Sequence, residues 1–119
     1  MNTKKAIKKE NKKNNDDSEI KLPNTDQSTI EEKFNATKQK GTNNYHSKFK
    51  GYEVAKKIFN RLKPTNIKFF KSSIAEGFSG KIKINGKEIK IAVRSSSSSL
   101  KTPTIDIWVS KSKHIEIRF

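Results

Sequence analysis

The most regular pattern in the sequence is an alternation of apolar and polar residues on either side of an Asn-Gly pair. The run reads KIKINGKEIKIAVR and spans residues 81–94. Asn-Gly tolerates the positive φ angles of a two-residue turn, so the run predicts a β-hairpin in which Ile82 faces Ile89 and Lys81 faces Lys90. Five apolar side chains then share one face, namely Ile82, Ile84, Ile89, Ile91 and Val93.

A second alternating pattern covers the last sixteen positions, with strands expected at residues 104–110 and 114–119 around a turn at 111–113. The expected register pairs Val109 with Ile115, Ile107 with Ile117, Ile105 with Phe119, Asp106 with Arg118 and Trp108 with Glu116. Trp108 then points to the polar side, where it is either covered by a helix or loop or serves as a platform for base stacking.

Residues 47–63 have the spacing of an amphipathic helix, and Pro64 ends the pattern. The apolar stripe consists of Phe49, Tyr52, Ala55, Ile58, Phe59 and Leu62. A strand is expected next at residues 67–71. Residues 72–80 are expected to be a loop or an irregular strand edge, because this stretch contains two glycines and three serines.

The first 45 residues are polar, and their apolar residues follow no sustained period. Residues 1–45 are therefore expected to be a disordered basic arm, with one short helix allowed from Ser28 to about Lys38. Residues 46–119 are expected to form a small α+β domain: one amphipathic helix packed on a four- or five-stranded, mainly antiparallel sheet. Such a small core suggests a homo-oligomer or a larger protein assembly.

The net charge of +15 is concentrated in the expected domain, which holds 17 cations and 5 acids. A fixed positive field of this size favours nucleic acid, DNA in the first instance, over a membrane or an acidic protein as the partner. The polar side of the first hairpin carries one acid, Glu88, among several cations. The candidate nucleic-acid-binding residues are Lys81, Lys83, Lys87, Lys90, Arg94 and Lys101.

Several classes of function have little support in the sequence. It contains no cysteine and only two histidines, so thiolate metal sites are excluded and a Ser-His-Asp triad is not indicated. No apolar run has the length of a signal peptide or a membrane span, and a cytoplasmic location is expected. Asp106, His114 and Glu116 could share a face and hold a metal ion, but an Asp106–Arg118 salt bridge is the expected use.

Five consecutive serines occupy residues 95–99, directly after Arg94. They are interpreted either as a solvated flexible loop or as a segment that contacts phosphate through hydroxyl and backbone N–H groups.

The stretches GYEVAKKIFNRL and FSGKIKINGKEIKIAVRSSSSS resemble the core of the PD-(D/E)xK, or restriction-endonuclease-like, superfamily. The resemblance implies a magnesium-dependent nuclease in which Glu53 is the helix acid, Arg94 replaces the catalytic lysine and the first strand acid lies near Ser79 or Glu76. Ala92 stands at the second acid and cannot ligate a metal, and Arg94 stays protonated. The resemblance thus implies the fold and nucleic-acid association more directly than catalysis.

Three hypotheses follow from these patterns. The first is a nucleic-acid-binding module that acts through the cationic hairpin face and needs no cofactor. The second is a metal-dependent nuclease with Glu53, Glu76 and Arg94 as catalytic residues and magnesium as the cofactor. The third is a structural subunit that pairs with another chain through its strand edges.

Overall fold

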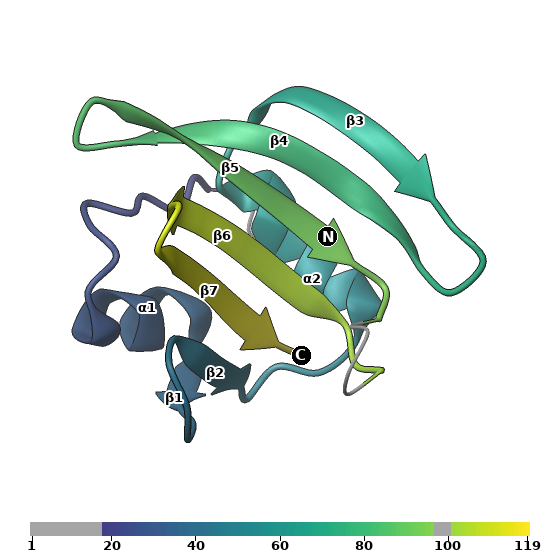
Figure 1. Ribbon diagram of the computed structural model, residues 1–119, viewed down its shortest axis with the longest axis horizontal. Coiled ribbons are helices and arrows are strands. Elements are labelled where there is room, and N and C mark those ends of the chain that lie inside the picture. Colours follow the sequence, from purple (N-terminus) through teal and green to yellow (C-terminus); the bar gives the residue numbers. More distant parts are fainter. Residues whose placement is uncertain (1–17, 97–100) are drawn as a thin grey trace, which may run out of the picture.

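The computed structural model describes residues 18–96 and 101–119, which form two helices and seven strands. In chain order these are α1 (Gln27–Phe34), β1 (Ala36–Lys38), β2 (Asn44–Ser47), α2 (Tyr52–Arg61), β3 (Thr65–Lys71), β4 (Glu76–Ile84), β5 (Lys87–Arg94), β6 (Thr104–Ser110) and β7 (Lys113–Arg118). All strands belong to one sheet with the order β1-β2-β7-β6-β5-β4-β3 (Figure 1). The pair β2–β7 is parallel, and the other neighbours are antiparallel.

The expected fold of one helix on four or five strands is wrong, because the segment assigned to a disordered arm supplies a helix and two strands. Ile30 and Phe34 of α1 are fully buried, and so is most of Tyr45 in β2. These three side chains pack against apolar residues of distant strands. The segment therefore folds although its apolar residues are not regularly spaced along the sequence. Residues 1–17 of the expected arm lie outside the described residues.

The first hairpin has the register expected from its sequence. Ile82 pairs with Ile89 and Lys81 pairs with Lys90, and Asn85 and Gly86 adopt positive φ angles of 54° and 78°. The strand β4 extends beyond the predicted hairpin, because it begins at Glu76 within the segment expected to be a loop or an irregular strand edge. Gly77 permits this extension: a Cβ at that position would collide with the Val93 carbonyl of β5.

The second hairpin forms with a register that differs from the expected one by two residues. Its pairs are Thr104 with Arg118, Ile105 with Ile117, Asp106 with Glu116, Ile107 with Ile115 and Trp108 with His114. The turn is shorter than expected, since Ser110 pairs with Lys113, and an irregularity between Trp108 and Ser110 absorbs one residue. A shift of two residues keeps every side chain on its expected face, so the alternation alone could not distinguish the two registers.

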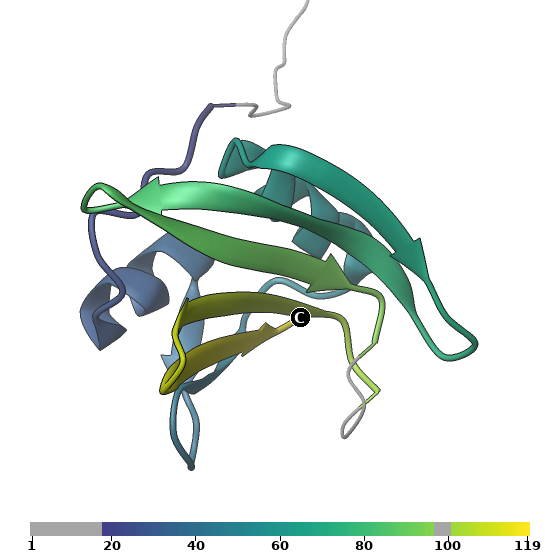
Figure 2. The ribbon, with the colours of Figure 1, turned by 45° about the horizontal axis from the view of Figure 1, so that its top comes forward.

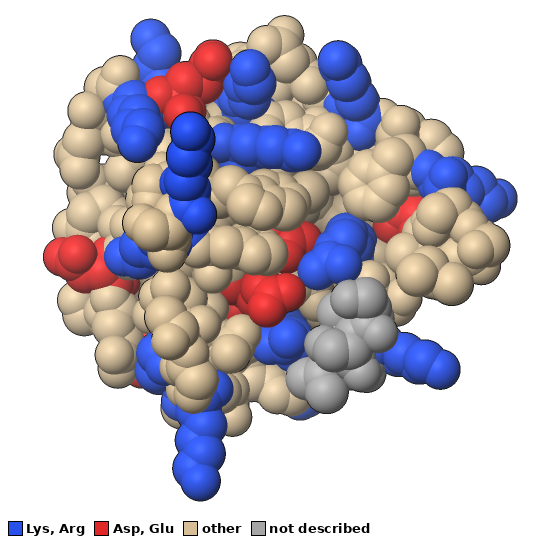
Figure 3. Space-filling model, in the orientation of Figure 1, with Lys and Arg blue, Asp and Glu red and all other residues tan. Residues whose placement is uncertain are grey.

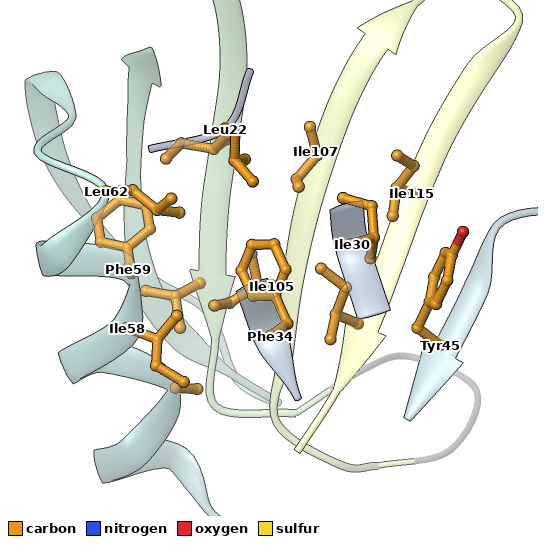
Figure 4. Close-up of a cluster of buried hydrophobic side chains, with 14 of the residues drawn as sticks. Leu22, Ile30, Phe34, Tyr45, Ile58, Phe59, Leu62, Ile105, Ile107 and Ile115 are labelled. Carbon is orange, nitrogen blue, oxygen red and sulfur yellow. The ribbon is translucent and has the colours of Figure 1, made fainter. Parts of the chain in front are cut away.

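Both helices cover the same face of the sheet (Figure 2). Side chains from α1, α2, β6 and β7 point toward one another there and form the core (Figure 4). The apolar stripe of α2 is confirmed at Ala55, Ile58, Phe59 and Leu62, which are buried. The helix begins at Tyr52 and not at residue 47, because Gly51 takes a φ of 99° and leaves Phe49 outside the helix and 45% exposed.

None of the helices in the described part of the chain has the length and apolar character that a bilayer span requires.

Candidate nucleic-acid interface

No helix covers the second face of the sheet within the described residues, and we call it the open face. In Figure 1 it is turned toward the reader, with α2 behind the strands. Figure 3 shows a small acidic patch over β6 and β7 on this face, with Lys and Arg side chains around it. The register places on it Ser79, Lys81, Lys90, Arg94, Asp106, Trp108, His114 and Glu116.

Asp106 lies at the centre of the open face, yet it has no solvent-exposed surface because neighbouring side chains close over it. Arg94 of β5 binds it with two N–H groups: Nε donates to Oδ2 at 2.7 Å and Nη2 donates to Oδ1 at 3.1 Å. On its other side, His114 Nε2 lies 2.9 Å from Oδ1. The buried carboxylate is therefore paired and hydrogen-bonded from two strands.

Glu116 extends this arrangement toward the parallel strand β2. Its two carboxylate oxygens lie 3.6 Å from Nη2 of Arg94 and 3.6 Å from Nη2 of Arg118. Arg118 also donates from Nη1 to the Asn44 side chain at 3.4 Å. We call Arg94, Asp106, His114, Glu116 and Arg118 the polar cluster. Two acids in the cluster balance two arginines, so the excess positive charge of the open face comes from its lysines.

Trp108 lies in a row of side chains that crosses three strands. The row starts at Lys90 of β5, whose ammonium lies 4.9 Å from the centre of the indole ring. On the β7 side, the His114 ring stacks on the indole at 4.8 Å with an interplanar angle of 8°. Trp108 is half-buried, and Lys90 and His114 from the two neighbouring strands contact its ring. The row joins the polar cluster to the lysines.

The lysines of β3, β4 and β5 border a hollow of about 650 Å³ on the open face. We call it the lysine hollow; it is lined by Asn66, Ile67, Lys68, Ser79, Gly80, Lys81 and Lys90. Lys81 and Lys90 are directly opposite each other, which is unfavourable for two like charges. Glu88 offsets only part of this repulsion, since its carboxylate lies 3.5 Å from Lys81 Nζ with both side chains about half exposed.

The six residues expected to bind nucleic acid do not all lie on one surface. Lys81, Lys83 and Lys90 are exposed and share the open face by register, whereas Arg94 is engaged by Asp106 and Glu116. Lys87 is exposed but belongs to the helix-covered face by register, and Lys101 is exposed in the connection between β5 and β6. Lys68 was not among the expected binding residues. It reaches the open face because β3 pairs with β4, and the sequence of β3 did not indicate this pairing.

Of the serine run, positions 97–99 lie outside the described residues. The first two serines bind neighbouring backbone: the Glu76 N–H donates to Ser95 Oγ at 3.0 Å, and Ser96 Oγ donates to the Ile74 carbonyl at 3.1 Å.

The three residues expected for a magnesium-dependent nuclease do not come together. Glu53 lies on α2, where its carboxylate is 3.0 Å from Lys56 Nζ. The hydrogen bond to Glu53 raises the pKa of Lys56, and the charge of Glu76 acts in the same direction. Both acids thus lie near Lys56 on the helix side of the sheet, while the Arg94 side chain binds acids on the open face.

The polar cluster does bring together three groups that could ligate a metal ion. One donor atom each from Asp106, His114 and Glu116 lies within 4.8 Å of the others. The donor set fits magnesium poorly, because magnesium prefers oxygen ligands and water, and the buried Asp106 carboxylate already accepts two N–H groups from the Arg94 cation. The salt bridge expected from Asp106 exists, with Arg94 as the partner and not Arg118.

The outer edge of β3 is the longer of the two sheet edges. Ile67 and Phe69 are 50% and 56% exposed there, which would suit pairing with another chain. The strand also contains Lys68 and Lys71 and an irregularity between Thr65 and Lys68. Charges and bulges of this kind oppose pairing between edges. The β3 edge therefore combines apolar residues that favour pairing with features that oppose it.

A comparison of the chain with protein-family models, curated proteins and solved structures found no match.

Proposed function

We propose that the protein binds nucleic acid through the open face of its sheet. The observation that carries this proposal is the lysine hollow, in which Lys68, Lys81 and Lys90 come from three adjacent strands and border one depression. A rigid sheet holds these cations together despite their repulsion, and a bound phosphate backbone would relieve it. Ser79 and Asn66 in the same lining offer further donors for phosphate oxygens.

The polymer would extend from the hollow toward Trp108, because Lys90 belongs to both features. Lys90 lies over one side of the indole ring and is itself exposed, so it can move toward a phosphate and leave the ring for a base. Phosphate contacts in the hollow and a contact at Trp108 together suit a polymer that offers both charge and aromatic rings.

The test is a titration of labelled duplex DNA, single-stranded DNA and single-stranded RNA of equal length, measured by fluorescence anisotropy across a salt series. The variant Lys68→Gln/Lys81→Gln/Lys90→Gln should weaken binding and lower the salt slope by roughly one unit per lost phosphate contact. The matched control is Lys40→Gln/Lys57→Gln/Lys111→Gln, which removes the same charge from exposed positions outside the hollow. Binding that ignores salt, or equal losses in both triple variants, would contradict the proposal.

A further inference from the structure

We infer that the open face also cleaves RNA without a metal ion, with His114 and Glu116 as the acid and base. This inference rests on the proposed function, since it uses the same face to hold the polymer. It starts from the composition of the polar cluster, in which a histidine, a carboxylate and two arginines meet beside the lysine hollow. These are the groups that proton transfer at a phosphodiester requires.

The two acid–base groups are accessible and close to each other. His114 and Glu116 are separated by one residue on β7 and point to the same face, where their side chains are 39% and 26% exposed. A ring nitrogen of His114 and a carboxylate oxygen of Glu116 lie within 4.8 Å of each other. Both groups can therefore reach a single phosphodiester that sits on the open face.

Asp106 acts as a positioning residue for His114. It is fully buried and contacts a nitrogen of the His114 ring at 2.9 Å, while Trp108 fixes the plane of the ring by stacking. A buried carboxylate against one nitrogen fixes the orientation of an imidazole. Asp106 holds Nε2, so Nδ1 is the ring nitrogen left for proton transfer on a side chain that is 39% exposed.

Arg94 offers hydrogen-bond donors to the phosphate. Arg94 uses Nε and Nη2 to bind Asp106, so its Nη1 N–H groups have no hydrogen-bond acceptor in the described part of the chain. The Arg94 side chain is 24% exposed, and its Nη2 lies 3.6 Å from Glu116. A phosphate oxygen beside Arg94 could accept hydrogen bonds from the Nη1 N–H groups, and the attraction would grow as the oxygen gains negative charge during the reaction.

The reaction that fits these groups uses the 2′-hydroxyl of RNA as the nucleophile. The Glu116 carboxylate takes the hydroxyl proton, the 2′-oxygen forms a bond to phosphorus, and the bond between phosphorus and the 5′-oxygen breaks. His114 gives its proton to the leaving 5′-oxygen. The products are a 2′,3′-cyclic phosphate and a 5′-hydroxyl, and proton exchange with water returns both side chains to their starting states. No oxidant, metal ion or bound water nucleophile enters the balance.

The experiment compares a labelled RNA oligonucleotide with its fully 2′-O-methylated copy, with the full chain and a chelator present. We expect the RNA to be cut into products with cyclic phosphate ends, identified by mass spectrometry, and the methylated copy to bind without being cut. His114→Gln and Glu116→Gln should each lower the cleavage rate by about 100-fold or more while binding of the methylated copy persists. Glu32→Gln, which removes an exposed carboxylate of α1 away from the open face, should leave the rate unchanged.

Circular dichroism and urea unfolding establish that the variants are folded, and all proteins are purified in parallel to control for contaminating ribonuclease. Binding of the methylated copy without cleavage of RNA would overturn the inference and leave the proposed function in place. Absence of binding to any polymer would overturn both. Cleavage that stops with the chelator and returns with manganese, or that survives both substitutions, would also overturn the inference.

Discussion

Replacing Arg94 by alanine should destabilise the protein more than replacing Asp106, although both changes remove the same ion pair. The difference arises from exposure: Asp106 has no accessible surface, whereas the Arg94 side chain is 24% exposed. Without Arg94, the Asp106 carboxylate remains buried, and His114 is its one remaining side-chain hydrogen-bond partner among the described residues. Without Asp106, the Arg94 guanidinium can take up water and still lies 3.6 Å from Glu116.

The expected magnitudes follow from these environments. Removing one partner of a buried ion pair typically costs about 3 to 5 kcal/mol, which we expect for Arg94→Ala. Loss of hydrogen bonds to a charged group that can rehydrate costs about 1.5 to 3 kcal/mol, which we expect for Asp106→Ala. In a domain of this size, each kcal/mol of lost stability lowers the melting temperature by roughly 4 to 8 °C. Arg94→Ala should therefore melt at a lower temperature than Asp106→Ala.

Urea unfolding measures both variants, followed by circular dichroism and by the fluorescence of Trp108, the one tryptophan of the chain. The double variant Arg94→Ala/Asp106→Ala is the decisive control, since it leaves no orphaned carboxylate and should be more stable than Arg94→Ala alone. A lower stability of Asp106→Ala than of Arg94→Ala, or single effects that simply add in the double variant, would contradict this prediction.

Two further predictions concern the core and the tyrosines. Phe34→Ala should cost about 3 to 5 kcal/mol, because Phe34 is fully buried, whereas Phe49→Ala should cost under about 1 kcal/mol at a side chain that is 45% exposed; equal urea midpoints would mean that α1 does not belong to the core. Burial raises the pKa of both Tyr45 and Tyr52 above the ordinary value of 10.0, so their contribution to stability is complete below pH 10.0 and is lost as pH rises through the folded-state values. An absorbance titration should place tyrosinate formation at higher pH in native protein than in urea, and coincident curves would contradict this.

The pairing and the faces of the first hairpin could be predicted from its local sequence. Asn85 and Gly86 select a two-residue turn, and that turn fixes every pair from Ile84 with Lys87 to Lys81 with Lys90. The face of each side chain follows from the turn and the period of two. The cationic side of β4 and β5 could therefore be predicted without knowledge of the rest of the chain, and so could the buried stripe of α2.

The register of the second hairpin could not be predicted from its local sequence. Its alternation is equally consistent with two registers that differ by two residues, and only the turn length and the irregularity near Val109 decide between them. The register decides which residues surround Asp106. The expected register placed Arg118 opposite Asp106, whereas in the structure Glu116 is opposite Asp106 and His114 contacts it.

The first hairpin, the core-facing side of α2 and the positive charge could be predicted from the sequence, because each depends on neighbouring residues or on composition. The inclusion of α1 and β2 in the core, and the ion pair of Arg94 with Asp106 across the β5–β6 pair, depend on contacts that form only in the folded protein. Ile30, Phe34 and Tyr45 lose water only where distant strands supply apolar surface, and the charge on Asp106 is tolerable only where Arg94 meets it. Such long-range partners leave no local periodicity in the chain.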